Sequence, residues 1–186
     1  MKNLVIFASG NGSNAREIIR YFNDNITLAR VVAIFCNRAR AGVVEIAKEA
    51  GLPCIVFDKA QLVEGQIYGR LAAFNPDLII LAGFLLQIPH EMIVRYPNRI
   101  INIHPALLPK FGGKGMYGSR VHEAVLEAQE IESGITVHYV DEHYDEGDII
   151  AQERCEVLPG DTAVTVASKV QQLEHYHYPR IIESLL

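Results

Sequence analysis

The 186-residue sequence lacks the features of several protein classes, beginning with cysteine pairs and an excess of positive charge. Its three cysteines, Cys36, Cys54 and Cys155, are far apart and form no C-x-x-C pair, which argues against a disulfide framework and a zinc site. We expect buried thiols instead. Lys and Arg number 17 against 22 Asp and Glu, and they are scattered, so nucleic acid is not an expected partner.

Long hydrophobic runs are also missing. The longest run, residues 78–86, is far shorter than a membrane span. The apolar start of the chain is only about six residues long, so a first core strand explains it better than a secretion signal. We therefore predict a cytoplasmic protein without a membrane partner. No G-x-S-x-G motif is present and no cysteine lies beside a plausible base, so covalent acyl-enzyme chemistry is not indicated.

Apolar runs of strand length alternate with amphipathic segments along the chain. The expected strands are residues 4–8, 31–35, 54–57, 78–82, 99–103, 134–140 and 149–157, and the expected helices are residues 14–22, 43–50, 66–74, 90–95, 120–129 and 162–185. The strands before residue 104 are apolar on both faces, as in parallel sheets that helices cover on each side. The pattern predicts a single Rossmann-like α/β domain over residues 1–186, with a mostly parallel sheet and mixed strands toward the C-terminus.

The segment Ser-Gly-Asn-Gly-Ser-Asn, residues 9–14, lies between the first expected strand and the first expected helix. Glycine permits positive φ and close approach of a ligand, and the free N–H groups at a helix start favour an anion. Ser13 or Asn14 could cap the helix or reach a phosphate. The segment matches neither a Walker A motif nor a complete G-x-G-x-x-G, which disfavours NAD. A tight turn with a helix cap is the alternative.

Asn102 and His104 are two residues apart at the end of an apolar strand, so both side chains should lie on one face. An amide beside an imidazole can stabilise an oxyanion and move protons. The acidic residues 141–148 include Asp145, and a carboxylate next to His104 would raise its pKa and fix its orientation. A structural His-Pro pair and a solvated hairpin turn are the alternatives, and the acidic spacing matches no EF-hand loop.

Five segments, in order along nearly the whole chain, resemble the folate-dependent formyltransferases. They are residues 9–14, residues 76–84, residues 101–109, residues 134–140 with 145–147, and residues 171–179. The most specific combination is Asn-x-His-Pro-x-Leu-Leu-Pro followed by a strand and an Asp-x-Gly. Within this family, residues 9–14 resemble the members that act in purine biosynthesis on a substrate carrying a phosphate.

The resemblance implies transfer of a formyl group from the cosubstrate 10-formyltetrahydrofolate to the amine of glycinamide ribonucleotide in de novo purine biosynthesis, without a metal. The implied catalytic residues are Asn102, His104 and Asp145; the implied ribonucleotide contacts are Gly12, Ser13, Asn14, Pro109, Gln171 and Glu174; the implied folate contacts are Leu85, Leu86, Gln87, Ile88, Asn102, Val140 and Asp141. Residues 1–104 would form the half that binds the ribonucleotide phosphate, and residues 105–186 the folate-binding and catalytic half. A cis Leu108–Pro109 bond and a monomer or homodimer are also implied.

The chain departs from the family pattern in two places. Where the family often has Met-Arg-Ile-Leu, residues 85–88 read Leu-Leu-Gln-Ile, so an arginine contact to folate is missing. Residues 112–118 form a longer, glycine-rich stretch near the expected active site. Three alternatives stay open: a deformylase that directs water at the same carbonyl, a sugar-amine formyltransferase, and a nucleotide-binding or regulatory protein that kept the fold and lost activity.

Overall fold

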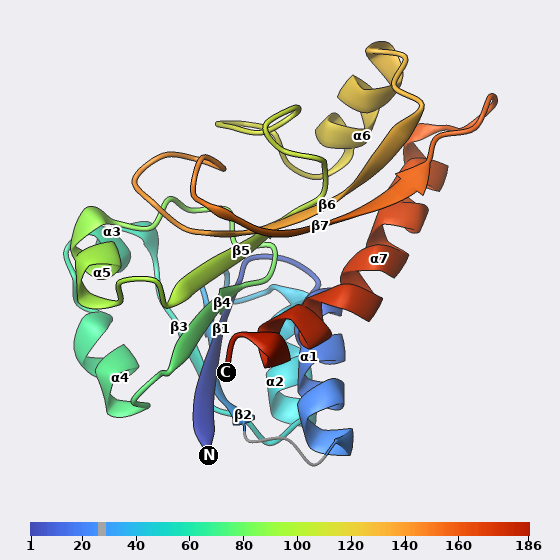
Figure 1. Ribbon diagram of the computed structural model, residues 1–186. Helices are drawn as coiled ribbons and strands as arrows, with labels where there is room; N and C mark the ends of the chain where they lie inside the picture. Colours follow the sequence, from blue (N-terminus) through green and yellow to red (C-terminus); the bar gives the residue numbers. More distant parts are fainter. Residues whose placement is uncertain (26–28) are drawn as a thin grey trace.

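The computed structural model describes residues 1–25 and 29–186. Its centre is a seven-stranded sheet with the strand order β3-β2-β1-β4-β5-β6-β7 (Figure 1). The strands are β1 (Lys2–Ala8), β2 (Ala29–Cys36), β3 (Cys54–Val56), β4 (Leu78–Leu81), β5 (Ile100–His104), β6 (Glu132–Tyr139) and β7 (Ile149–Glu156). From β3 to β5 neighbouring strands are parallel, whereas β6 pairs antiparallel with both β5 and β7. The predicted fold class is confirmed.

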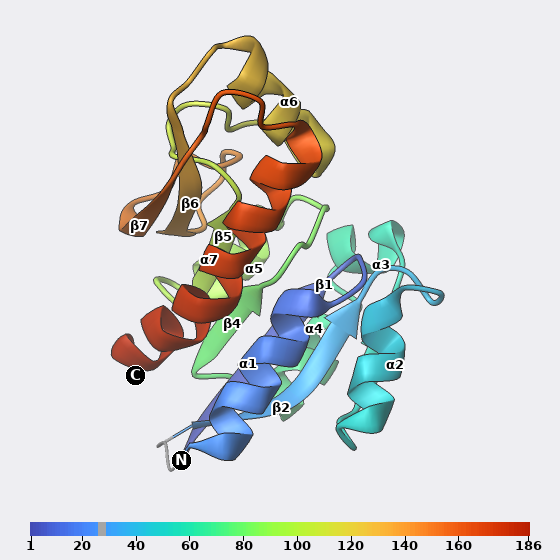
Figure 2. The ribbon, with the colours of Figure 1, turned by 90° about the vertical axis from the view of Figure 1, so that its right-hand side faces the viewer.

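Helices cover both faces of the sheet. α1 (Ser13–Asp24), α2 (Gly42–Glu49) and α7 (Ala163–Ser184) share one core with Leu4 and Ile6 of β1. α3 (Lys59–Val63), α4 (Tyr68–Ala73) and α5 (His90–Arg95) share the other core with Val5 and Phe7. Figure 2 shows α1 and α7 side by side, and α6 (Ser119–Glu127) also packs on α7. Because successive strand residues point to opposite covered faces, the parallel strands are largely apolar, whereas β7 carries polar residues and is partly exposed.

One described helix, α3, is absent from the expected set, and the ends of the expected helices agree with the structure within two residues. Residues 59–63 form the short helix α3, which was not expected, and the helix expected over residues 66–74 covers only Tyr68–Ala73. A capping box starts α3, because Asp58 Oδ1 accepts from the Gln61 N–H at 2.8 Å and Gln61 Oε1 accepts from the Asp58 N–H at 2.9 Å. Local hydrogen bonding of this kind defines a short helix that apolar periodicity does not reveal.

Tyr178 fixes the long helix α7 beside the cavity-facing end of β4. Its side chain is fully buried, and its hydroxyl donates to the Leu81 carbonyl at 3.0 Å. Burial without this hydrogen bond would cost free energy, so the contact sets the position of the helix against the strand. The residues of α7 just before Tyr178 are thereby held close to the ends of the central strands.

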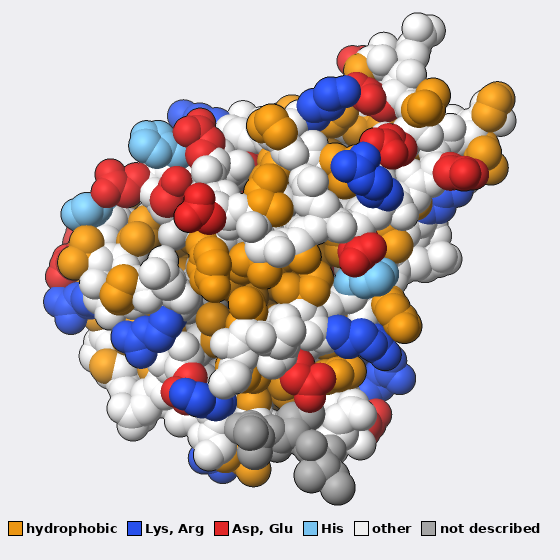
Figure 3. All heavy atoms as spheres, in the orientation of Figure 1, with side chains coloured by type: hydrophobic (Ala, Val, Ile, Leu, Met, Phe, Trp, Pro, Cys, Tyr) orange, Lys and Arg blue, Asp and Glu red, His pale blue; other side chains and the backbone are white. Residues whose placement is uncertain are grey.

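The charged side chains are scattered over the surface, as they are along the sequence. Side chains of opposite charge are interspersed over the face shown in Figure 3, around a band of hydrophobic side chains. Within residues 1–25 and 29–186, no helix is long and apolar enough to cross a membrane.

Candidate active site

A cavity of about 860 Å³ opens at the carboxyl ends of β1, β4 and β5, the edge where ligands bind in open α/β sheets. Its wall is formed by the β1–α1 loop, the β4–α5 loop, the end of β5, residues 113–119, the loop after β6 and one side of α7. The predicted site residues that line it are Gly12, Ser13, Asn14, Leu85, Leu86, Gln87, Ile88, Asn102, His104, Val140, Asp141, Asp145, Gln171 and Glu174. Nearly all of the predicted ligand contacts therefore share one cavity.

Gly12 in the β1–α1 loop is the N-cap of α1 and has a φ of 81°. A Cβ atom on this residue would lie 2.8 Å from Val43 Cβ of α2. Glycine is thus required by positive φ and by close packing against α2. Of the two roles considered for Ser13 and Asn14, the structure does not show helix capping, because the N-cap Gly12 makes no side-chain hydrogen bond and the Ser13 N–H donates to Asn11 Oδ1 at 3.3 Å. The second role, contact with a phosphate, stays a prediction.

Ser13 and Asn14 contact α7. Asn14 Nδ2 donates to Glu174 Oε2 at 2.9 Å, and Gln171 Nε2 donates to Ser13 Oγ at 3.4 Å. Burial raises the pKa of Glu174, and the hydrogen bond from Asn14 opposes this effect. Four of the predicted ribonucleotide contacts therefore lie together at one end of the cavity, directly above the N-terminus of α1.

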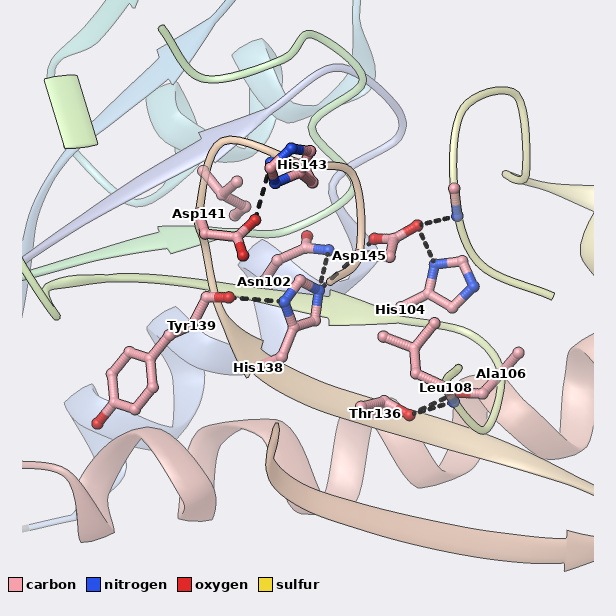
Figure 4. A network of polar contacts seen from close by, with 12 residues as sticks. Asn102, His104, Ala106, Leu108, Thr136, His138, Tyr139, Asp141, His143 and Asp145 are labelled. Carbon is pink, nitrogen blue, oxygen red and sulfur yellow. Dashed lines mark hydrogen bonds and ion pairs between the residues drawn. The ribbon is translucent and has the colours of Figure 1, made fainter. Parts of the chain in front are cut away.

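Asn102 and His104 both face the cavity from β5, as their spacing on a strand requires. His104 is only 3% exposed. Its Nε2 atom donates to the Phe111 carbonyl at 2.8 Å, and its Nδ1 atom lies 3.4 Å from Asp145 Oδ2 (Figure 4). Only the protonated imidazole carries hydrogen on both nitrogens, so two oxygen partners favour the charged form in this geometry.

Asp145 is held in place by the backbone of the glycine-rich loop. Its Oδ2 atom accepts from the Gly113 N–H at 2.9 Å. Asp145 and Phe111 have φ values of 60° and 57°, a left-handed conformation that costs a non-glycine residue about 1 kcal/mol or more. Two strained residues thus contact the two ring nitrogens of His104, which indicates that the surrounding structure fixes this imidazole.

The paired groups His104 and Asp145 both have pKa values below their ordinary ones. Burial lowers the pKa of His104, and the Asp145 carboxylate and the Phe111 carbonyl oppose burial without overcoming it. The Asp145 carboxylate thus raises the His104 pKa as expected, but burial, which was not considered, has the larger effect. Burial also disfavours ionisation of Asp145, but its contacts with His138, His104 and the Gly113 N–H outweigh burial and lower its pKa. An ionised carboxylate thus faces a histidine that takes up a proton less readily than usual.

His138 of β6 belongs to the same network but was not singled out in the sequence (Figure 4). Its Nδ1 atom donates to the Tyr139 carbonyl at 2.8 Å, and its Nε2 atom lies 3.1 Å from Asn102 Nδ2 and 3.5 Å from Asp145 Oδ1. The Nε2 atom of His138 therefore lies between the Asn102 amide and the Asp145 carboxylate. The available sequence signal was a polar alternation, Thr136 and His138, in an otherwise apolar strand.

His122 of α6 is a second histidine that the sequence analysis missed. It lines the cavity, is 6% exposed, and its Nδ1 atom is buried without a hydrogen-bond partner among the described residues. Burial lowers its pKa, and the nearby His104 adds to this effect. Within the described parts of the chain, no group of three or more His, Cys, Asp or Glu side chains is arranged to hold a metal ion.

The β4–α5 loop forms a largely apolar wall of the cavity. Residues 85–88 and residues 140–141 line it together. Gln87 Nε2 donates to the Glu142 carbonyl at 2.9 Å, which joins the two loops. Residues 85–88 contribute no positive charge, because leucine occupies position 86.

Pro109 is the one predicted contact that does not line the cavity. The cis Leu108–Pro109 bond implied by the resemblance is confirmed, but Pro109 itself is exposed. Gly112 follows closely, and a Cβ atom there would lie 2.5 Å from Leu108 Cδ2 and 3.2 Å from Asp145 Cβ. Glycine at this position allows the chain to pass between these two side chains.

Residues 2–182 match the family described as Formyl transferase, and the chain belongs to this family. Its relatives include proteins named phosphoribosylglycinamide formyltransferase. The Bacillus subtilis protein of that name is 37% identical over 191 residues, which are 100% of this chain and 95% of the relative. The crystal structure of the Brucella melitensis protein of that name has a TM-score of 0.90 and 38% identity, covering 99% of this chain and 95% of the other.

The plant relatives are longer. The chloroplastic phosphoribosylglycinamide formyltransferase of Arabidopsis thaliana is 40% identical over 99% of this chain. This chain spans 65% of that relative and 61% of the corresponding Vigna unguiculata protein, slightly less than two thirds of each.

Proposed function

We propose that the protein is an enzyme that transfers the formyl group of 10-formyltetrahydrofolate to the amine of glycinamide ribonucleotide. The observation that carries this proposal is the meeting of Asn102, His104 and Asp145 in one cavity with two different ends. One end is a helix N-terminus with polar side chains, and the other is an apolar wall. Residues 1–104 and 105–186 act as one unit, since both parts contribute to both ends.

The ribonucleotide would bind at the N-terminus of α1. Its phosphate would accept hydrogen bonds from the backbone around Gly12 and from Ser13, where the helix dipole favours an anion. Gln171 and Glu174 lie beside Ser13 and Asn14, so they would contact the ribose or the glycinamide. This placement directs the amine of the substrate toward the end of β5.

The formyl folate would bind against residues 85–88 and residues 140–141, whose apolar side chains suit a flat heterocycle. The neutral amine attacks the formyl carbon, and the carbonyl oxygen becomes an oxyanion. The Asn102 amide and charged His104 stabilise this oxygen, which competes with the Phe111 carbonyl for the Nε2 hydrogen. Alignment of the two substrates supplies a further part of the rate enhancement.

The tetrahedral intermediate then loses its bond between the formyl carbon and folate N10. The amine nitrogen gives up one proton and N10 gains one, so the products are the formylated ribonucleotide and tetrahydrofolate. Asp145 favours the charged form of His104, against the effect of burial, and relays the proton through water. The proposed partners are thus two small molecules.

The test is an assay of the purified protein with glycinamide ribonucleotide and 10-formyltetrahydrofolate, with both products identified by mass spectrometry. Formylated ribonucleotide in amounts equal to tetrahydrofolate supports the proposal. Free formate released without an amine acceptor would instead identify a deformylase. Binding of both ligands without turnover would identify a protein that has lost the activity.

A further inference from the structure

The cavity has an unusual balance of charges for an enzyme with two anionic substrates. Apart from its histidines, its charged lining residues are the carboxylates Glu123, Asp141, Asp145 and Glu174 and one lysine, Lys114. No other Lys or Arg of the described residues lines it. Arg120, which is near in sequence, lies over the Tyr117 ring at 5.7 Å and outside the cavity wall. Lys114 is therefore the lining residue, other than the histidines, that can form an ion pair with an anionic group of a bound substrate.

Lys114 is available for such a contact. Among the described residues its ammonium group forms neither an ion pair nor a hydrogen bond, whereas Lys110 on the same segment is bound to Glu130 at 2.7 Å. Gly113 and Gly115 flank it with φ values of 95° and 90°. Glycine on both sides leaves the backbone free to direct the long side chain into or out of the cavity.

The position of Lys114 favours a contact with the folate over a contact with the ribonucleotide. The preceding N–H of Gly113 donates to Asp145, so the loop begins beside residues 140–145, on the folate side of the cavity. The ribonucleotide phosphate has its own binding elements at the N-terminus of α1. Lys114 is exposed and lines the cavity, so it lies at the rim. A folate whose heterocycle packs against residues 85–88 would extend its polar glutamate end from the apolar wall toward solvent at this rim.

We propose that Lys114 binds the glutamate carboxylates of the formyl folate and so determines the preference for a folate over a pteroate. This inference rests on the proposed function, since it assigns a contact to one of the two proposed substrates. The contact is an electrostatic one at an exposed rim. Lys114 therefore affects binding of the cosubstrate and leaves the chemical step unchanged.

The experiment compares 10-formyltetrahydrofolate with 10-formyltetrahydropteroate, which lacks the glutamate, in the wild type and in Lys114→Gln. The KM for the folate should rise roughly three- to tenfold in the variant. This fold-change corresponds to an interaction whose strength lies between that of an exposed ion pair and that of a charge-assisted hydrogen bond. The KM for the pteroate and the KM for the ribonucleotide should not change. Lys114→Arg should restore the wild-type KM, and higher salt should weaken folate binding only in proteins that keep the charge.

Lys110→Gln is the matched control, because this lysine lies on the same segment, is paired with Glu130 and is outside the cavity. Equal KM changes for folate and pteroate, a change for the ribonucleotide alone, or no change in any KM would each overturn the assignment. Calorimetric titration of tetrahydrofolate and tetrahydropteroate makes the same comparison without turnover. A protein that binds folate through Lys114 but forms no product would therefore contradict the proposed function and leave this inference standing.

Discussion

Replacing Asp145 by asparagine removes a negative charge 3.4 Å from His104 Nδ1 while keeping the size of the side chain. Asparagine can still accept the Gly113 N–H through its own carbonyl oxygen, so the loop should stay in place. Burial already lowers the pKa of His104, and the carboxylate is the main group that opposes it. We expect the pKa of His104 to fall further in Asp145→Asn, because the remaining surroundings disfavour the charged ring.

The size of the effect can be bounded from the geometry. Coulomb's law with an effective dielectric constant of about 20 gives roughly 5 kcal/mol for unit charges at this separation, an upper limit because both charges are delocalised. Loss of one group that stabilises an oxyanion costs about a hundred- to a thousandfold in rate, or roughly 3–4 kcal/mol. We therefore expect kcat/KM to fall by about two to three orders of magnitude at alkaline pH, within the Coulomb limit.

The informative quantity is the ratio of wild-type to variant kcat/KM across pH. Titration of the substrate amine is the same for both enzymes and cancels in this ratio. Above both His104 pKa values the ratio should be large and constant. Below both, His104 is charged in each enzyme, and the ratio should fall to the smaller, constant value that loss of the proton relay alone contributes. Glu142→Gln is the control, because this carboxylate lies on the same loop, pairs with His90 and does not line the cavity.

A ratio that stays the same at every pH would refute this reasoning, because Asp145 would then contribute something other than the charge of His104. Circular dichroism and the unfolding midpoint of each variant would exclude loss of the fold as the cause. A ratio that falls as the pH rises would contradict even the direction of the electrostatic effect.

Gly12→Val should lower the free energy of unfolding by roughly 2–5 kcal/mol through overpacking and backbone strain. Gly10→Ala, whose Cβ meets nothing within 4 Å, should change it by less than about 0.5 kcal/mol, as measured by urea unfolding. The stability of Glu174→Gln relative to the wild type should increase as the pH rises through 4.5, the ordinary pKa of a glutamate, because the buried wild-type carboxyl group then has to ionise. Unfolding midpoints of both proteins across this pH range measure the difference in stability. Asn102→Ala and His104→Ala should each lower kcat by about a hundred- to a thousandfold, and the double variant should lose less than the product of the two, in steady-state assays.

Each of these expectations has a distinct contrary result. Wild-type stability of Gly12→Val would mean that α2 moves aside without cost. A stability difference for Glu174→Gln that does not depend on pH would mean that the wild-type carboxylate ionises as readily as in water. Fully multiplicative losses in the double variant would mean that Asn102 and His104 act independently.

The parallel strands could be predicted from the sequence because the part of a sheet that is covered on both faces needs apolar residues at nearly every position. Ile79 and Ile80 of β4 show why, since one packs into the core shared with α5 and the other into the core shared with α1. The helix α3 could not be found in this way, because it is five residues long and starts from the side-chain hydrogen bonds of Asp58 and Gln61. The three-residue spacing of Asp58 and Gln61 permits these bonds, but the conformation of the folded chain determines whether they form.

In the candidate site, too, some features could be predicted from the sequence and others could not. Asn102 and His104 could be paired because alternation along a strand is a local property. The participation of His138 could not be predicted, since it depends on the register between β5 and β6. The lowered pKa of His104 was missed for a related reason: a neighbouring carboxylate can be guessed from a nearby turn, whereas burial is the sum of contacts from the whole fold.

The antiparallel register of β5 and β6 places Asn102 opposite His138 and His104 opposite Thr136. A slip of one residue would turn His138 to the other face of the sheet and dismantle the network. In the connection between these strands, Phe111, Gly112 and Gly113 are constrained by their contacts with His104, Leu108 and Asp145. Residues 114–118 have no such constraint, because adding residues to a surface loop costs little once its ends are fixed. Evolution can therefore lengthen or shorten this part and change how the cavity rim meets a ligand, while the chemistry beneath it is inherited intact.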